Sequence, residues 1–219
     1  MRMSLARVGI IGDVHGEDLR LENVLRFLEA QTEELFCTGD VVDGAGDVNR
    51  CCALLQEHNV VTVRGNHDRW LLEGSMRDLN EATPVEELTG ESLAFLQSLA
   101  GTHALDTVAG RALLCHGVGE NDMQRLTLDD YGYALEVKYE LHDLIRAGEF
   151  RFMIGGHTHR PMVKTFDSLT VINAGTLYRY HQPAALLVDF ASGSAHFYSF
   201  DGDKINQDCR ELKLLAKSL

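Results

Sequence analysis

Short apolar runs of strand length recur along the first third of the chain, and a polar loop follows each of them. These runs are residues 8–11, 35–37 and 60–63. Segments of helical periodicity separate the runs, so the order is strand, loop, helix. This order favours a mostly parallel sheet, in which ligand sites lie outside the carboxyl ends of the strands.

Helical periodicity is clearest directly after the first strand. Apolar side chains recur there every three to four positions, at Leu19, Val24, Leu25 and Leu28. Such spacing predicts a helix with one buried face. Further helices are predicted over residues 48–58, 69–100 and 127–147, with the second of these three interrupted near Pro84 and Gly90.

Most of the second half of the chain has the pattern of short strands. Residues 103–108 and 111–115 flank Ala109-Gly110, which is a hairpin signal. More strands are predicted at residues 150–154, 163–166, 170–173, 184–189 and 195–198. Turns are expected at residues 167–168 and 192–193, and the last dozen residues are expected to be amphipathic or frayed.

The composition is that of a globular protein. Of the 219 residues, 45% are hydrophobic and 24% are charged, whereas disorder would need fewer apolar residues. The length fits one domain with a substantial core. We therefore expect a single domain over residues 1–219, with helical elaborations at about 69–100 and 117–149.

The formal net charge of −13 narrows the range of partners. An acidic surface repels duplex nucleic acid and anionic lipid, so we expect no stable binding to a DNA duplex. It also repels an anionic substrate unless cations lie at the site. No apolar run is long enough to cross a bilayer, and the first residues lack the features of a signal peptide, so we expect a cytoplasmic protein.

The five cysteines do not form a C-x-x-C pair, and their number is odd. They are Cys37, Cys51, Cys52, Cys115 and Cys209. We interpret them as buried, reduced thiols in preference to a redox or metal site.

Five clusters of polar residues follow predicted strands. They contain Asp13 and His15; Asp40 and Asp43; Asn66, His67 and Asp68; His116; and His157 and His159. Because neighbouring strands lie about 4.8 Å apart, groups at strand ends can converge. Mixed oxygen and nitrogen ligands suit divalent Mn, Fe, Co, Ni or Zn, whereas Mg or Ca would favour oxygen alone.

Charge favours a pair of metal ions. Two divalent ions bring four positive charges, and the carboxylates of Asp13 and Asp40 return two negative ones. The site then stays positive, which resolves its conflict with the acidic surface. Paired ions about 3.5–4 Å apart can clamp the attacking and leaving oxygens of phosphoryl transfer.

Each cluster by itself has a simpler interpretation. A D-x-H triplet can occur by chance, and a G-D-x-x-D run is often a turn followed by a helix cap. A single histidine is more often a surface or core residue than a ligand. The occurrence of all five clusters in order, each at a predicted strand end, is what favours a metal site.

Together the clusters resemble the motifs of the calcineurin-like metallophosphoesterases. The matching runs are Asp13-x-His15, Gly39-Asp40-x-x-Asp43, Gly65-Asn66-His67-Asp68, Cys115-His116-Gly117 and Gly156-His157-x-His159. The resemblance extends over about residues 7–201, and the short chain is similar to compact bacterial and archaeal members of phosphodiesterase type. Residues 63–68 also resemble the serine/threonine and diadenosine-tetraphosphate phosphatases.

The resemblance implies an α/β fold, a four-layer α/β/β/α sandwich of two mixed sheets flanked by helices. It implies hydrolysis of phosphate esters with two divalent metal ions. The implied ligands of one ion are Asp13, His15 and His159, those of the other are Asn66, His116 and His157, and Asp40 bridges the two.

The resemblance also implies roles for residues that are not metal ligands. His67 would lie near the leaving group and protonate it, and Asp68 would fix the orientation of His67. Asn66 would help to neutralise charge on the phosphate oxygens.

Other neighbours of the motifs have less certain roles. Arg64 and Arg160 either hold a phosphate oxygen or form ordinary surface ion pairs. Asp43 is expected to orient another residue and not to bind metal. Relatives often carry Asn-Pro-Gly-Ser where residues 173–176 read Asn-Ala-Gly-Thr, a change that borders the site and removes no ligand.

The pattern leaves the substrate, the native metal and the oligomeric state open. The substrate can be a small phosphodiester or monoester, a nucleotide, a phosphoprotein or a dinucleoside polyphosphate. A scaffold without catalysis is the alternative of another class, and the retained His67 argues against it. Five aromatic side chains can either stack on a base or pack as core, and we favour packing. They are Trp70, Tyr131, Tyr133, Tyr139 and Tyr178.

Overall fold

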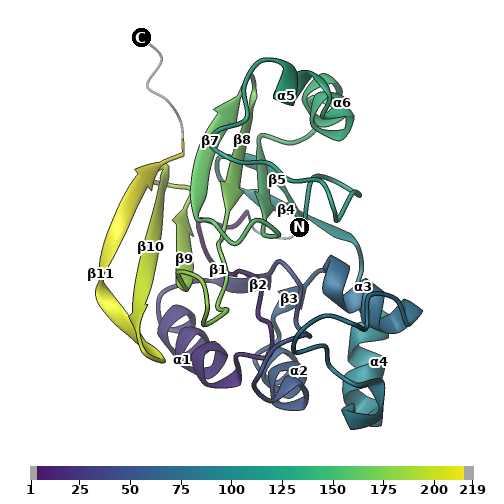
Figure 1. Ribbon diagram of the computed structural model, residues 1–219. Helices are drawn as coiled ribbons and strands as arrows, with labels where there is room; N and C mark the ends of the chain where they lie inside the picture. The colour runs from purple at the N-terminus through teal and green to yellow at the C-terminus, as the bar shows by residue number, and fades with distance from the viewer. Residues whose placement is uncertain (1–3, 215–219) are drawn as a thin grey trace.

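The computed structural model describes residues 4–214 and contains two β-sheets that face each other (Figure 1). The first sheet has the order β11 (Lys204–Lys213), β10 (Ser194–Asp201), β9 (Ala184–Asp189), β1 (Arg7–Ile11), β2 (Glu34–Cys37) and β3 (Val61–Thr62). The second has the order β4 (Thr102–Thr107), β5 (Gly110–Cys115), β6 (Phe152–Gly155), β8 (Leu169–Asn173) and β7 (Met162–Phe166).

Both sheets are mixed, so the prediction of a mostly parallel sheet was wrong. Strands β1, β2 and β3 are parallel to one another, as are β5, β6 and β8. The remaining pairs are antiparallel. Short turns cause most of this difference, because a turn of a few residues can join only antiparallel neighbours. The hairpin predicted around Ala109-Gly110 is confirmed as the β4–β5 pair.

Helices cover the outer faces of the two sheets. They are α1 (Asp18–Glu29), α2 (Val48–Glu57), α3 (Asn66–Glu73), the 3-10 helix η1 (Val85–Glu87), α4 (Gly90–Ser98), α5 (Tyr133–Glu136) and α6 (Tyr139–Ala147). Figure 1 shows α1 and α2 beside β1 and β2, and α5 and α6 at the opposite end, near β7 and β8. The four-layer α/β/β/α sandwich is therefore confirmed.

Both faces of the central strands are buried, and successive side chains enter two different cores. Val8, Ile10 and Phe36 point into the core between the two sheets, while Ile11 and Cys37 join the core under the helices. Successive side chains of a strand point to opposite faces, so a strand covered on both sides reads as a continuous apolar run. A third core lies between the second sheet and α6, where Leu141 is packed.

Several element boundaries differ from the prediction. Leu19 is 53% exposed, and Leu21 takes its place on the buried face of α1. Residues 75–84 and 127–132 are irregular and not helical, and β3 has only two residues. Strand β11 was not predicted, because the polar side chains of this exposed edge strand carry no alternation. The expectation for the last dozen residues lies partly outside the described residues, at 215–219.

Within residues 4–214, none of the helices has the length and apolar character needed to cross a bilayer.

Candidate metal centre

The predicted ligands lie where the carboxyl ends of the parallel strands of both sheets meet. Asp13 follows β1, Asp40 follows β2, and Asn66 is the first residue of α3, after β3. His116 directly follows β5, and His157 comes two residues after β6. The first three residues come from one sheet and the other two come from the second sheet. The residues therefore converge across the junction of two sheets, and not along the edge of a single sheet.

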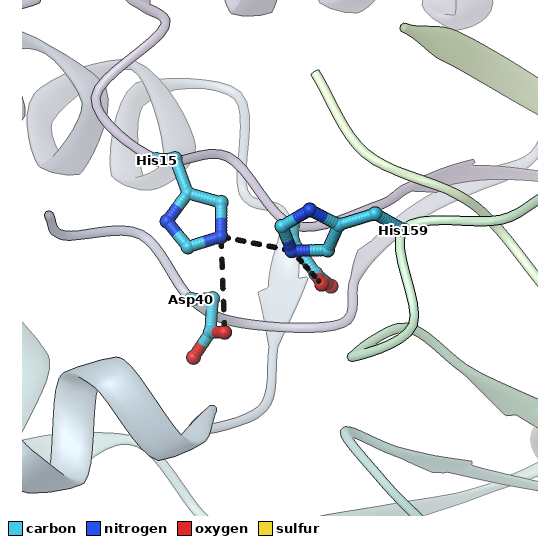
Figure 2. A group of neighbouring side chains, drawn as sticks. His15, Asp40 and His159 are labelled. Carbon is cyan, nitrogen blue, oxygen red and sulfur yellow. Dashed lines mark hydrogen bonds and ion pairs between the residues drawn. The ribbon is translucent and has the colours of Figure 1, made fainter. Parts of the chain in front are cut away.

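Four of the seven predicted ligands form one compact group. One ligand atom from each of Asp13, His15, Asp40 and His159 lies within 4.8 Å of the others. The Nε2 atom of His159 is 3.1 Å from Oδ2 of Asp13 and 3.1 Å from Nε2 of His15. Figure 2 shows the rings of His15 and His159 turned toward each other above Asp40. These atoms enclose a position with the size and chemistry of a metal site.

The other three predicted ligands form a second group, on the far side of Asp40. The Nε2 atom of His116 lies 2.9 Å from Oδ1 of Asn66 and 3.2 Å from Oδ2 of Asp40. The ring of His157 packs beside His116, with 5.2 Å between ring centroids. The same Oδ2 of Asp40 is 3.9 Å from Nε2 of His15 in the first group. Asp40 thus faces both groups with one oxygen, which is the position that a bridging ligand needs.

Hydrogen bonds fix which nitrogen of each buried histidine faces the centre. Nδ1 of His15 lies 2.9 Å from the carbonyl of Asp43, and Nδ1 of His116 lies 2.8 Å from that of Thr38. A carbonyl only accepts, so the proton is on Nδ1 in both rings. Burial lowers the pKa of His15 and so favours the neutral ring, in which Nε2 carries the lone pair and faces Nε2 of His159 at 3.1 Å. Two ring nitrogens that face each other beside carboxylates fit a bound cation.

The charges of the centre also favour a bound cation. Burial raises the pKa of Asp13 and Asp40, but the neighbouring histidines outweigh burial and hold both values below the usual range. Two buried carboxylates are therefore ionised side by side. Burial lowers the pKa of His116, but Asp40 and Asp13 outweigh it and raise the value to about 10. The carboxylates bind a proton tightly in this position, and a divalent ion would meet the same demand for positive charge.

Backbone strain is concentrated at the centre. Among the described residues, nine non-glycine positions have positive φ, and five of them are His15, Asp40, Asp43, His157 and His159. Such conformations cost on the order of 1 kcal/mol or more each and persist only where the surroundings enforce them. The loops after β1, β2 and β6 are thus bent to turn these side chains inward, which is typical of a functional site.

Two glycines allow the carboxylates to pack closely against the backbone. A Cβ atom at Gly156 would collide with Oδ1 of Asp13, and a Cβ atom at Gly65 would collide with Oδ1 of Asp40. These contacts explain why each glycine directly precedes a predicted ligand residue, His157 or Asn66. A larger residue at either position would displace the carboxylate.

Comparison with known proteins agrees with this geometry. The family model of the calcineurin-like phosphoesterase superfamily domain matches residues 6–193 of the chain. The chain belongs to this superfamily. An uncharacterised protein of Methanocaldococcus jannaschii is 23% identical to this calcineurin-like phosphoesterase over 185 residues, which cover 80% of the chain and 72% of that protein.

Solved structures have the same fold. A metallophosphoesterase from Sphaerobacter thermophilus has a TM-score of 0.65 at 21% identity, covering 89% of this chain and 88% of that one. Vps29 of Entamoeba histolytica, crystallised in complex with zinc, has a TM-score of 0.56 at 15% identity, covering 95% and 99% of the two chains. The resemblance inferred from the motifs and the fold that it implied are both confirmed.

In this calcineurin-like phosphoesterase, a different carboxylate from the predicted one holds His67. The Nδ1 atom of His67 lies 2.8 Å from Oδ2 of Asp43. The carboxylate of Asp68 instead accepts hydrogen bonds from the backbone N–H groups of Val41 and Gly65. The expectation that Asp68 orients His67 was wrong, because Asp68 is the third residue of α3 and its side chain turns back to cap that helix. The orienting role predicted for Asp43 agrees with this contact.

Among the predicted arginines and aromatic residues, Trp70 and Tyr178 contact histidines of the centre. Arg64 is partly buried after β3, and Arg160 is exposed next to His159. The ring of Trp70 is 4.8 Å from that of His67, and the ring of Tyr178 is 5.2 Å from that of His15. Three other tyrosines were expected to pack in the core, and this expectation was wrong. Their side chains are at least 70% exposed, and they lie before or in α5 and α6: Tyr131, Tyr133 and Tyr139.

Sequence reasoning missed several residues that position the centre. Thr38 donates its hydroxyl to Oδ1 of Asp13 at 3.1 Å, and Thr176 donates its hydroxyl to the carbonyl of Asp13 at 2.8 Å. Arg77 donates to both oxygens of Asp43 at 3.0 Å. His181 lies 2.7 Å from His159. The two threonines border motif residues, which is a usable signal, whereas Arg77 and His181 lie in segments without a motif.

Proposed function

We propose that this chain hydrolyses phosphate esters of a small molecule or a nucleotide, with two divalent metal ions bound between the two sheets. The observation that carries the proposal is the position of Oδ2 of Asp40 between two groups of predicted ligands, 3.9 Å from Nε2 of His15 in one and 3.2 Å from Nε2 of His116 in the other. We propose Asp13, His15 and His159 as ligands of one ion and Asn66, His116 and His157 as ligands of the other, with Asp40 as the bridge.

The chemistry of the donor set supports borderline divalent ions. Imidazole nitrogens outnumber carboxylates, which suits Mn, Fe, Co, Ni or Zn. Zinc is bound by the similar fold of Vps29 from Entamoeba histolytica. When bound, the two ions would supply positive charge to the phosphate and activate the attacking water. The superfamily match supports hydrolysis of a phosphate ester as the reaction.

We propose that His67 acts as the proton donor to the leaving oxygen. Because Nδ1 of His67 is held by Asp43, Nε2 is the atom free to carry a proton toward a substrate. Burial lowers the pKa of His67, but the hydrogen bond that its ring donates to Asp43 and the charge of Asp40 outweigh burial and raise it. A raised pKa favours the protonated ring, as a general acid requires. Asn66 and the guanidinium groups of Arg64 and Arg160 are proposed to contact phosphate oxygens.

Rings next to the centre support an ester with an aromatic or nucleoside group. Trp70 contacts His67, and Tyr178 contacts His15. Aromatic side chains beside a phosphate site offer faces on which a base can stack. Among the possible esters, a nucleotide or an aryl ester therefore fits these two rings better than a small aliphatic one.

The test is hydrolysis of bis-p-nitrophenyl phosphate and p-nitrophenyl phosphate by the purified protein with added Mn²⁺, compared with the same protein after treatment with EDTA. We expect metal-dependent release of p-nitrophenol from at least one substrate. The relative rates distinguish a diesterase from a monoesterase. A protein that binds metal and hydrolyses neither ester would contradict the proposal and favour a scaffold on the same fold.

A further inference from the structure

His181 lies outside every motif and contacts one of the proposed metal ligands. Its Nδ1 atom is 2.7 Å from Nδ1 of His159, and the ring centroids are 4.6 Å apart. The other ring nitrogen of His159, Nε2, faces Oδ2 of Asp13 at 3.1 Å and Nε2 of His15 at 3.1 Å. One ring nitrogen of His159 thus faces the centre, and the other faces His181.

This arrangement settles the direction of the hydrogen bond when Nε2 of His159 binds a metal ion. A neutral imidazole carries one proton, and a nitrogen that binds metal has none. The proton of His159 is then on Nδ1 and is donated to Nδ1 of His181. Ligand histidines usually donate their second N–H to a partner, which fixes the tautomer and the ring orientation and strengthens the ligand.

The segment that carries His181 is held firmly in place. Arg179 donates both its backbone N–H and its guanidinium to Glu17, a buried carboxylate at the start of α1. Tyr178 donates its hydroxyl to Glu81 at 3.0 Å, and its ring is 5.5 Å from that of His181. These contacts hold the two residues that come shortly before His181, so an anchored backbone presents His181 to His159 although its own side chain is exposed.

We propose that His181 is a positioning residue that holds the ring of His159 through this hydrogen bond and so sets the affinity of the ion bound by Asp13, His15 and His159. The inference rests on the proposed function, since it requires His159 to be a metal ligand. His181 does not contact the other group of ligands through any hydrogen bond found among residues 4–214. Its effect should therefore be confined to one of the two ions.

The experiment is a calorimetric titration of the metal-free protein with Mn²⁺, in which two variants of His181 are compared with wild type. His181→Phe keeps a ring against Tyr178 and removes the acceptor. His181→Asn keeps an acceptor near the position of Nδ1. His58→Asn, at the end of α2, is the matched control, because it removes a histidine that pairs with Glu29 away from the centre.

For His181→Phe we expect the dissociation constant of one ion to rise by about 10- to 100-fold while that of the other stays within twofold. His181→Asn should recover most of the loss, and His58→Asn should match wild type. The thermal midpoint of each metal-free variant shows whether the fold is intact, and we expect it to be unchanged.

Two results would overturn the inference. One is an unchanged affinity for both ions in His181→Phe, and the other is an equal loss in His181→Phe and His181→Asn, which would indicate packing and not hydrogen bonding. A wild-type protein that takes up no Mn²⁺ gives a different pattern. It would overturn the proposed function, and the role of His181 with it.

Discussion

The carboxylate of Asp43 joins two side chains, since its Oδ2 atom is 2.8 Å from Nδ1 of His67 and 3.0 Å from a guanidinium nitrogen of Arg77. Arg77 also donates to Oδ1, so the carboxylate is held at both oxygens. A held carboxylate fixes the ring of His67 at the rim of the centre. The pair lies beside the proposed ligands without being part of them, so the proposed proton transfer and metal binding would rest on different side chains.

Substitution of this pair should reduce turnover and leave the metal in place. His67→Asn is expected to lower kcat by about 10²- to 10⁴-fold, the usual contribution of a general acid. Asp43→Asn should lower it by a smaller factor, and asparagine tolerates the positive φ of 64° at this position. The measurement is kcat on bis-p-nitrophenyl phosphate together with the metal content of each variant.

The matched control for this pair is Asp143→Asn, an exposed carboxylate on α6 that pairs with Arg146. It should behave as wild type. Unchanged kcat in His67→Asn would remove this histidine from the mechanism, whereas loss of metal in the same variant would make it a ligand or a support of one.

A single methyl group at Gly156 should disrupt the centre. Gly156→Ala places a Cβ atom in collision with Oδ1 of Asp13, so the carboxylate must move and metal affinity should fall. Gly90→Ala is the control, because no atom lies within 4 Å of the added Cβ. Metal content by atomic absorption, after dialysis at fixed free Mn²⁺, compares the two. If Gly156→Ala retains full metal content, the close packing against Asp13 is not required.

The motif residues could be located from sequence because each follows an apolar strand. Asp13, Asp40 and His116 lie directly beyond β1, β2 and β5, as the alternation of apolar and polar runs indicated. Their spatial partners could not be found in this way. The contact between Asp43 and His67 depends on the path of the loop at residues 40–46. Asp68 is nearer to His67 in sequence, but its carboxylate accepts hydrogen bonds from backbone N–H groups at the start of α3 and in that loop.

The spacing of apolar residues did not predict the polar strand β11. It also predicted a helix over residues 75–84, which are irregular. Most side chains of strand β11 are polar, and its pairing with β10, which the sequence pattern does not reveal, defines it. Residues 75–84 contain no repeated apolar spacing that packs, and the chain there bends to bring Arg77 and Thr83 onto Asp43. Hydrogen bonds to Asp43, and not a buried apolar face, hold that segment.

The buried face of α1 gives a prediction for stability. Leu28 is fully buried, whereas Leu19 was expected on the same face and is 53% exposed. Leu28→Ala should lower the free energy of unfolding by about 2–5 kcal/mol. Leu19→Ala should change it by no more than about 0.5 kcal/mol. Urea unfolding followed by circular dichroism measures both, and equal losses would contradict this orientation of the helix.

The thiols should differ sharply in reactivity. Burial raises the pKa of Cys52 to about 12 and that of Cys115 to about 12, and it also raises the pKa of Cys37 and Cys51. Thiolate is the reactive form, so these four groups are un-ionised and shielded at pH 8. Cys209 is exposed, which corrects the expectation that all five are buried. A disulfide reagent should titrate one thiol rapidly in the folded protein and five in urea; two or more rapid thiols would contradict the packing.

The bridging position of Asp40 gives a prediction for metal binding. Because its Oδ2 atom faces both groups of ligands, Asp40→Asn should weaken both ions, whereas His159→Asn should weaken only one. Asparagine again tolerates the positive φ at each position. Calorimetric titration with Mn²⁺ gives the two affinities. Full occupancy of both sites in Asp40→Asn would rule out the bridge.

Metal-dependent hydrolysis at a two-ion centre is tested most directly by measuring hydrolysis and bound metal on the same sample as Mn²⁺ is returned to the metal-free protein. The account predicts two ions per chain and phosphate-ester hydrolysis that rises as the second ion binds. Hydrolysis at full rate in the metal-free protein, or a protein with both ions bound that cleaves neither p-nitrophenyl ester, would contradict it.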